Sequence, residues 1–378
     1  MEELKLTTEN NRRLYYNSET LKSIKKELEE FTSSTTFSTS PSFPKEILFP
    51  YELKNNNAIE GYNEDLSSII KIINNPFLRS SKINDEYQRV YNLFNGYEYI
   101  LKEKNINKNT LRKLYEILSY GLLNDSDLLR EGKNYRHDDV YIFYSTNLAR
   151  KPDLGFNCNN IEPHMNELFE YINTNNNLSD VDLFIKSQII HFYMVFIHPY
   201  FDINGRCART TSLWFLNKNN NFSYTIFNRG IPYNKNKYYR AIREAKIYRN
   251  LTSFIMLISI WTKEELEKEY IIRSMDKSIY SSLSPIEKQV IQYILTNKSI
   301  NTLIDIQCFY NRFNPPKKVD FINDELLEPL FKKDILLKGN ITEKFISKIA
   351  SNNYRFSLNP DIFDYDRTKI KRLTPNKY

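Results

Sequence analysis

The sequence predicts a mainly helical protein of two or three units. Glycine is scarce, with 8 residues among 378, whereas a turn-rich β fold needs many glycines at its tight turns. Apolar residues recur at three- and four-residue spacing along most of the chain, which is the period of an amphipathic helix. The length exceeds what a single hydrophobic core usually serves.

The composition is that of a globular protein, with 41% hydrophobic and 26% charged residues. The net charge of +7 is small for this length, so it permits a nucleotide or nucleic-acid partner without requiring one. No apolar run approaches the roughly 18 residues of a membrane span, and the first residues lack the apolar core of a signal sequence. Cys158, Cys207 and Cys308 lie far apart, which argues against a zinc site or a disulfide framework. We therefore expect a cytoplasmic protein without membrane contact.

Residues 1–84 predict an N-terminal helical extension. Within residues 1–30 the apolar side chains lie at amphipathic spacing, at Leu14, Leu21, Ile24 and Leu28. Residues 31–46 are rich in Ser, Thr and Pro and predict a loop. A short helix then ends at Gly61, because glycine readily takes the left-handed conformation that stops helices.

Residues 85–262 predict the main core, built from helices and one extended segment. Helix-period apolar positions run through three parts of it, residues 85–120, 161–174 and 181–197. Residues 129–142 break this period. Val140, Ile142 and Tyr144 then occupy alternate positions, as in an edge strand or a hairpin.

The residues with the clearest chemistry follow directly after the helix predicted to end at residue 197. They are HPYFDINGRCAR, from His198 to Arg209, and the apolar run after them predicts a second helix. A loop that leads into a helix N-terminus offers free backbone N–H groups and the positive end of the helix dipole, which suit phosphate. Arg206 and Arg209 fall on one face of this helix and would hold further phosphate oxygens.

Two more side chains of this loop suit phosphoryl transfer. Asp202 offers the kind of oxygen ligand that a phosphate-bridging Mg²⁺ takes. His198 is the candidate general base for an attacking hydroxyl group. Each also has a structural alternative, a packed histidine at a helix end and a carboxylate that caps the next helix. The gathering of so many phosphate-binding features in one loop favours the catalytic interpretation.

This stretch resembles the motif of the Fic family, roughly HPFx(D/E)GNGRxxR. Tyr200 replaces the Phe of the motif, which is a mild change. Ile203 stands where the family usually has Gly, a residue that lets the backbone approach phosphate and take a positive φ. A β-branched residue resists positive φ. We expect the loop to reach the same shape with a negative φ at Ile203, and the alternative is a weaker hold on phosphate.

The resemblance implies a Fic-type core over residues 85–262 that transfers AMP from ATP to a Ser, Thr or Tyr hydroxyl group of a protein, the chain itself included. His198 would remove the hydroxyl proton, and Asp202 would hold Mg²⁺. The phosphates would be held by the loop and the helix after it, at Ile203, Asn204, Gly205, Arg206 and Arg209. Arg206 is assigned to the β-phosphate and Arg209 to the γ-phosphate. A homodimer is the candidate assembly.

A second stretch, from Asn56 to Gly61, resembles the Fic inhibitory motif (S/T)xxxE(G/N), with Asn56 at the Ser/Thr position. Asn still accepts and donates hydrogen bonds, so a helix of this kind is expected. The resemblance implies that Glu60 pairs with Arg209 and thereby occupies the guanidinium that should hold the γ-phosphate.

Residues 129–142 resemble the Fic segment that precedes the target-docking flap. A flap is therefore expected at Val140, Tyr141 and Ile142, continuing through residues 145–150. Such a flap holds a segment of the target protein by strand addition, where backbone pairing matters more than side-chain identity.

Residues 228–261 resemble the Fic helix that closes the nucleotide pocket, with Tyr239 on its adenine side. Lys246 stands where an Asn is often found, so the base preference stays open. UTP or a phosphocholine-bearing nucleotide is an alternative donor.

Residues 263–378 predict a separate C-terminal module of helices and strands. Helical periods run from residue 285, and residues 354–358 alternate like a closing strand. This is a winged-helix-like pattern, which is often appended to Fic domains. Its charges are mixed, so DNA is its less favoured partner.

Two other functions stay open. Some Fic relatives use the inhibitory Glu to position a water molecule that removes AMP from a modified target, and Glu60 would then be essential rather than restraining. Alternatively, the chain is a DNA-binding regulator with a degenerate Fic core, disabled at Ile203.

Overall fold

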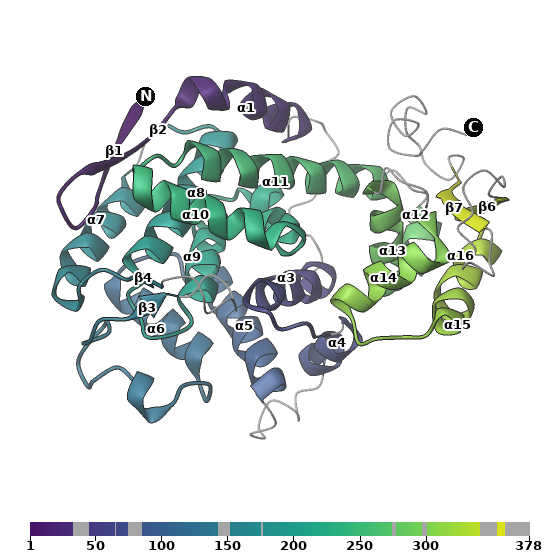
Figure 1. Ribbon diagram of the computed structural model, residues 1–378, viewed down its shortest axis with the longest axis horizontal. Coiled ribbons are helices and arrows are strands. Elements are labelled where there is room, and N and C mark those ends of the chain that lie inside the picture. Colours follow the sequence, from purple (N-terminus) through teal and green to yellow (C-terminus); the bar gives the residue numbers. More distant parts are fainter. Residues whose placement is uncertain are drawn as a thin grey trace. The chain divides into compact units, whose positions relative to one another are not determined.

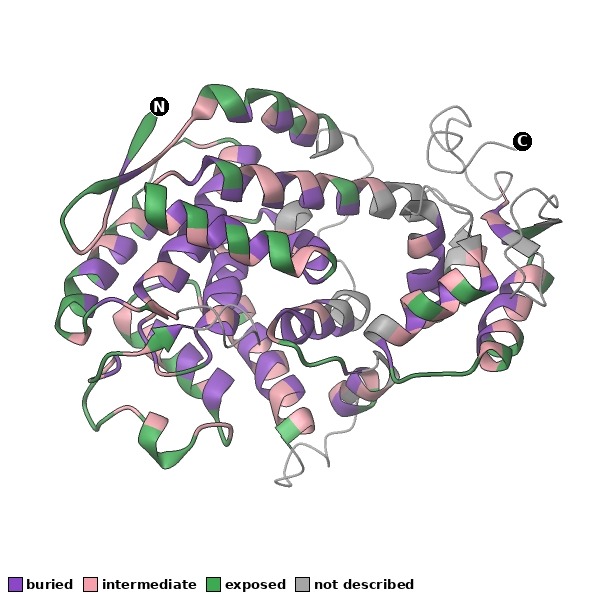
Figure 2. Cartoon of the chain, in the orientation of Figure 1, coloured by how far each residue is buried: buried purple, intermediate pink, exposed green. Residues whose placement is uncertain are grey.

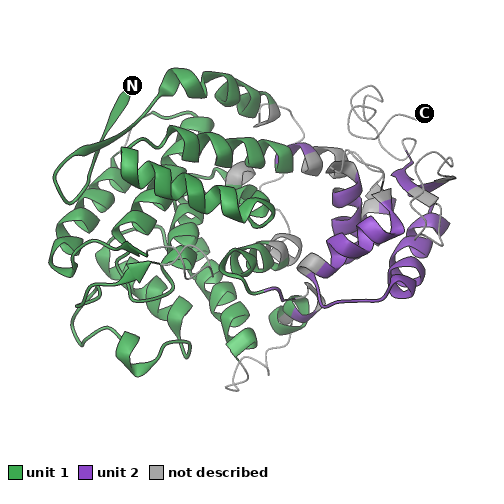
Figure 3. Ribbon diagram, in the orientation of Figure 1, with its two compact units in different colours: residues 1–62, 69–265 green, residues 63–68, 266–378 purple. Residues whose placement is uncertain are grey.

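A computed structural model describes residues 1–32, 45–64, 66–74, 85–142, 152–174, 177–273, 277–296, 301–340 and 354–359 (Figure 1). The chain forms two compact units (Figure 3). Unit 1 comprises residues 1–62 and 69–265, and unit 2 comprises residues 63–68 and 266–378. Helices predominate in both, as the sequence predicted.

Two helices form the centre of unit 1, and both are buried along almost their whole length (Figure 2). They are α8 (Asp180–Ile197) and α9 (Asn204–Lys218). The second half of α8, from Ile189 to Ile197, is apolar apart from His191 and Tyr193, which suits a helix inside the core. Its first turn is capped by Ser179, whose Oγ accepts a hydrogen bond from the Asp182 N–H at 3.2 Å.

Other helices of unit 1 cover this pair. The helices packed on α9 are α3 (Lys45–Glu60), α5 (Asp85–Lys102), α6 (Lys108–Ser119) and the 3₁₀ segment η4 (Phe222–Gly230). Those packed on α8 are α1 (Ser18–Thr32) and α7 (Ile161–Asn173). The remaining short segments of unit 1 are η2 (Asp125–Asp127), η3 (Cys158–Asn160) and η5 (Pro232–Asn234), and α4 (Leu66–Asn74) has residues in both units.

The first sixteen residues correct one prediction. A helix was expected over residues 1–30, but β1 (Glu2–Thr7) and β2 (Arg13–Tyr16) form an antiparallel hairpin, and only α1 is helical. Leu4 and Leu6 are buried while Glu3 and Lys5 are exposed, which is the two-residue period of a strand. Thr7 fixes this strand on α7, because its Oγ1 donates to Glu167 Oε1 at 2.8 Å.

The expected extended segment is present. β3 (Tyr141–Ile142) pairs antiparallel with β4 (Asp153–Leu154), and the Gly155 N–H donates to the Val140 carbonyl at 3.1 Å. The predicted continuation of the flap at residues 145–150 lies outside the described residues.

The stretch from residue 228 to 261 is not one helix. It contains α10 (Lys235–Tyr248) and the start of α11 (Thr252–Arg273). They are separated at Arg249, whose φ of 58° is left-handed and so ends α10. Across the described residues, no helix combines the length and the apolar character needed to cross a membrane.

Unit 2 has its own apolar core, which includes Val290, Ile306, Leu330 and Phe356. Its helical segments are α12 (Lys277–Ser282), α13 (Pro285–Thr296), α14 (Leu303–Phe313), α15 (Val319–Phe321), η6 (Ile322–Leu327) and α16 (Glu328–Lys332). Its strands are β5 (Asn301–Thr302), β6 (Leu336–Asn340) and β7 (Tyr354–Leu358), in the order β5-β7-β6. This order supports the winged-helix assignment, which stays a prediction.

Candidate active site

The loop between α8 and α9 has left-handed backbone at both ends. His198 ends α8 with φ 57°, and Ile203 precedes α9 with φ 67°. The expectation of a negative φ at Ile203 is therefore wrong. A β-branched residue in this region costs about 1–2 kcal/mol, and burial offsets the cost, because Ile203 is 2% exposed. The side chain points into the core, so the loop takes a glycine-like backbone path at this position.

Asn204 fixes the shape of this loop. Its Oδ1 accepts a hydrogen bond from the Tyr200 N–H at 3.0 Å, and its Nδ2 donates to the Tyr200 carbonyl at 2.8 Å. Tyr200 is fully buried, and its ring stacks on Tyr115 with the centroids 3.8 Å apart. Both ends of the Asn204 side-chain amide are thus engaged within the loop.

His198 is held as a neutral imidazole. Burial, together with the positive charges of Lys246 and Arg136, lowers its pKa to about 3. Its Nδ1 lies 3.4 Å from the Val195 carbonyl, which only accepts, so Nδ1 carries the ring proton. The lone pair is then on Nε2, as a general base requires.

The first turn of α9 carries the predicted phosphate-binding residues. Gly205 is only partly covered, whereas Arg206 is 5% exposed. Nε and Nη1 of Arg206 are buried and lack a hydrogen-bond partner among the described residues. A buried guanidinium with unused donors beside a helix N-terminus fits a polyphosphate anion.

Arg209 is bound by α3. Its Nη2 donates to Glu60 Oε1 at 2.5 Å, and its Nε donates to Asn56 Oδ1 at 2.8 Å. The Asn56 carbonyl accepts a further bond from Nη2 at 3.3 Å. The carboxylate also lies over the start of α9, because a Cβ on Gly205 would collide with Glu60 Oε1. The pair predicted from two separate motifs is thus in contact.

Glu60 is ionised in this position. Burial raises its pKa, but Arg209, Arg206 and Lys235 outweigh that effect and hold the pKa below the usual value. Its side chain is 27% exposed and that of Arg209 is 1% exposed. An anion therefore already occupies the start of α9.

The hydroxyl group of Tyr239 is engaged by α3. It donates to the Ile59 carbonyl at 3.0 Å, so it binds the last turn of α3. In the flap, the side chain of Ile142 is buried and that of Tyr141 is 67% exposed. The two strand residues thus face opposite sides, as the alternation predicted.

The residues present fit a single magnesium ion that would be held jointly by one protein carboxylate and the substrate. Asp202 is exposed, and its Oδ1 accepts the Ile203 N–H at 2.6 Å, which orients the carboxylate and leaves Oδ2 available. Among the described residues no three His, Cys, Asp or Glu side chains gather as a metal site. A single carboxylate agrees with Mg²⁺ that takes its other ligands from phosphate and water.

Comparison with protein families shows what the middle of the chain resembles, because the Fic/DOC family model matches residues 105–216. These residues form a Fic/DOC domain. The match includes His198 and both arginines, whereas Glu60 and Tyr239 lie outside it. A search of curated proteins found no match.

The mainly helical fold with small hairpins also resembles solved Fic proteins. A Fic family protein from Desulfovibrio desulfuricans has a TM-score of 0.52 at 17% identity, over 90% of this chain and 95% of that chain. Fic-1 from C. elegans has a TM-score of 0.47 at 15% identity, over 67% and 71%. A Fic domain containing signaling protein from Bacteroides thetaiotaomicron has a TM-score of 0.48 at 15% identity, over 66% and 94%.

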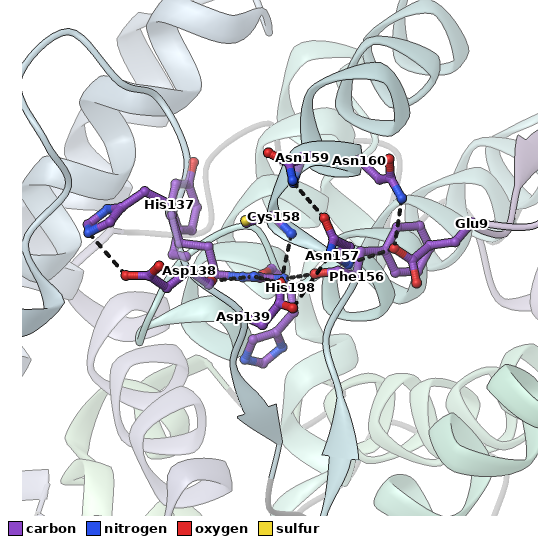
Figure 4. Close-up of polar contacts among 12 residues, drawn as sticks. Glu9, His137, Asp138, Asp139, Phe156, Asn157, Cys158, Asn159, Asn160 and His198 are labelled. Atoms are coloured by element: carbon purple, nitrogen blue, oxygen red, sulfur yellow. Dashed lines mark hydrogen bonds and ion pairs between the residues drawn. The ribbon is translucent and has the colours of Figure 1, made fainter.

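Sequence reasoning missed one residue inside the Fic/DOC domain. Arg136 is 2% exposed, and its guanidinium donates to three backbone carbonyls, those of His198 at 2.8 Å, Asp138 at 2.6 Å and Phe156. Figure 4 shows His198 beside Phe156 and Asp139 at this junction. The signal was the YR pair at residues 135–136, which resembles the family's flap segment but did not by itself indicate a contact with the histidine turn.

A second missed contact comes from the N-terminal hairpin. Glu9 follows β1, and its Oε1 accepts the Asn157 N–H at 2.6 Å and an Asn160 Nδ2–H bond at 3.3 Å (Figure 4). The hairpin thus supports the turn that follows β4. No local pattern indicated this, because the two partners are far apart in the sequence.

Proposed function

We propose that the Fic/DOC domain transfers AMP from ATP to a Ser, Thr or Tyr hydroxyl group of a protein, and that Glu60 restrains it. The observation that carries the proposal is the carboxylate between Arg209 and Gly205. A bound anion at a helix N-terminus, beside two buried guanidinium groups, marks the place where phosphate groups would bind.

In the proposed reaction His198 Nε2 accepts the proton of the target hydroxyl group. The hydroxyl oxygen forms a bond to the α-phosphorus, and the bond to the oxygen that bridges the α- and β-phosphates breaks. Pyrophosphate leaves with that electron pair. Arg206 and Arg209 offset the negative charge of the β- and γ-phosphates, so the acceleration comes from positioning and charge stabilisation.

Asp202 would hold Mg²⁺, which would offset phosphate charge when bound. The backbone N–H groups at the start of α9 would face the phosphates, and Asn204 would keep them in place through its two bonds to Tyr200. The target segment would pair with the strand edge at Val140, Tyr141 and Ile142.

The restraint follows from competition. As long as Glu60 accepts the Nη2–H bond of Arg209, that guanidinium does not bind the γ-phosphate. ATP would then lie with its α-phosphate misaligned for attack. Loss of alignment alone costs roughly a hundredfold in rate.

Labelling with radioactive ATP tests the proposal. We expect the Glu60→Gly variant to label itself or an added target roughly a hundredfold faster than the unaltered chain. Adding His198→Ala to that variant should abolish the signal while leaving ATP binding intact. Equal labelling with and without Glu60 would remove the inhibitory assignment, and labelling that survives His198→Ala would remove the base.

A second candidate, removal of AMP from a modified target, is favoured by one observation. Glu60 is ionised and 27% exposed at the same site, so it is able to accept a hydrogen bond from an attacking water molecule. In that case Glu60→Gly would abolish release of AMP from a pre-labelled target. Under the first candidate the unaltered chain releases no AMP.

A further inference from the structure

A third cation lies near the Glu60 carboxylate, outside the Fic motif and outside the matched domain. It is Lys235, the first residue of α10. Its Nζ would lie 3.6 Å from a Cβ on Gly61, at the end of α3 directly after Glu60. It also lies 5.9 Å from the centroid of the Tyr239 ring, one turn further along α10.

The charges at this point do not balance. Three cations, Arg206, Arg209 and Lys235, act on the carboxylate of Glu60, and Asp202 offsets part of the charge of Arg206. Within the described residues Lys235 forms no ion pair, and it is half-buried, so its charge is only partly solvated. An excess of positive charge around one carboxylate calls for a ligand that carries more negative charge than Glu60 does.

Lys235 lies on the Arg209 side of this cluster. The groups that act on its ammonium are Glu60 and Arg209. The carboxylate of Asp202, in addition to that of Glu60, acts on Arg206. The two ends of the phosphate chain would therefore meet different cations, with Arg206 near the metal-binding carboxylate and Lys235 at the far end.

We infer that Lys235 is a phosphate-binding residue that contacts the γ-phosphate of a nucleoside triphosphate together with Arg209, and that it selects triphosphates over diphosphates. This inference rests on the proposed function and deepens it. With Glu60 in place, the ammonium helps to retain the carboxylate. When Glu60 moves away, the same ammonium is left facing the terminal phosphate.

The test measures binding of MgATP and MgADP by calorimetry, in a Glu60→Gly, His198→Ala background that binds nucleotide without turnover. Lys235→Met should weaken ATP binding by about tenfold or more, because one charge-assisted contact is lost. ADP binding should change by less than about twofold, since ADP has no γ-phosphate. Lys237→Met is the matched control, because Lys237 lies in the same turn of α10 but is exposed.

Lys235→Arg keeps the charge and should retain the preference for ATP, which a merely structural role would not predict. Circular dichroism of each variant establishes that α10 is folded. Equal losses for ATP and ADP, or no loss for either, would show that the Lys235 assignment is wrong while the proposed function stands. A background variant that binds neither nucleotide would overturn both.

Discussion

Oε1 of Glu60 lies 2.5 Å from Nη2 of Arg209, and the two partners differ sharply in exposure, at 27% and 1% of their side chains. The carboxylate is able to turn towards water, whereas the guanidinium is not. Removing the carboxylate of Glu60 therefore leaves the Arg209 guanidinium buried without a counter-charge, which destabilises the fold.

We accordingly expect Glu60→Gln to lower the free energy of unfolding of unit 1 by about 3 kcal/mol in phosphate-free buffer. Urea unfolding followed by tryptophan fluorescence measures it, because Trp214 and Trp261 both belong to unit 1. MgATP should restore part of the loss, since its phosphates replace the carboxylate. An unfolding midpoint that does not change would show that Arg209 does not depend on this partner.

Replacing Asn56 should loosen the contact between α3 and Arg209 less than replacing Glu60 does. Its side chain accepts a bond from Arg209 Nε and donates one to the Tyr97 hydroxyl group at 3.0 Å. Asn56→Ala removes both bonds, at about 1 kcal/mol each, but leaves Glu60 in place. Labelling with radioactive ATP should fall between that of the unaltered chain and that of Glu60→Gly. Asn55→Ala is the control, and the prediction fails if the two Asn variants label equally.

At Ile203 two effects oppose each other. Ile203→Gly relieves the positive φ, worth about 1–2 kcal/mol, but removes a buried side chain worth about 2–5 kcal/mol. We expect a net loss of stability of about 1–3 kcal/mol, measured by the same urea titration. A more stable variant would mean that backbone strain exceeds the packing energy at this position.

The pKa of His198, lowered to about 3, predicts an unusual pH profile. An unperturbed histidine would gain a proton below its ordinary pKa of 6.5 and lose its function as a base. Here the imidazole stays neutral, so labelling by Glu60→Gly should not fall between about pH 7.5 and about pH 5.5. A rate that halves near the ordinary value would contradict this.

Lys246 contributes to that low pKa by its charge. Lys246→Met removes the repulsion of the protonated ring, so the pKa of His198 should rise towards its ordinary value. Nuclear magnetic resonance titration of the ring protons measures the shift. Lys237→Met, which removes an exposed lysine of the same helix, should leave the titration unchanged.

The C-terminal module is expected not to retain DNA. Its third helical region, from α15 to α16, exposes acidic groups, namely Asp320, Asp324 and Glu325, which repel phosphate. A gel shift of the full chain with sheared genomic DNA at two salt concentrations measures this. Retention that weakens steeply with salt would instead favour the DNA-binding alternative.

The sequence predicted the helices and strands whose apolar residues recur with a clear period within the element itself. Residues 181–197 and 354–358 show unbroken periods, and they form α8 and β7 with nearly the predicted bounds. The N-terminal hairpin was missed because its strand period spans only six residues and the later leucines match a helix.

The sequence predicted the part of the candidate site that lies within a single motif. The Glu60–Arg209 contact joins residues 149 positions apart and came only from the family resemblance. The backbone at Ile203 has a positive φ, although a β-branched residue disfavours it, because packing around the loop outweighs this local preference. Lys235 had no chemical signal in the sequence, since a lone basic residue usually indicates a solvated surface, and the YR pair at residues 135–136 did not indicate the three bonds that Arg136 makes.

The guanidinium of Arg136 bonds at once to the carbonyls of His198, Asp138 and Phe156. One rigid, planar cation therefore couples the root of the flap, the segment after β4 and the turn that bears the base. A docked target strand that displaced the flap would have to break one of these bonds or move the imidazole with it. Under the proposed function, recognition of the target backbone and alignment of the base would be mechanically linked in this way, whichever protein is the target.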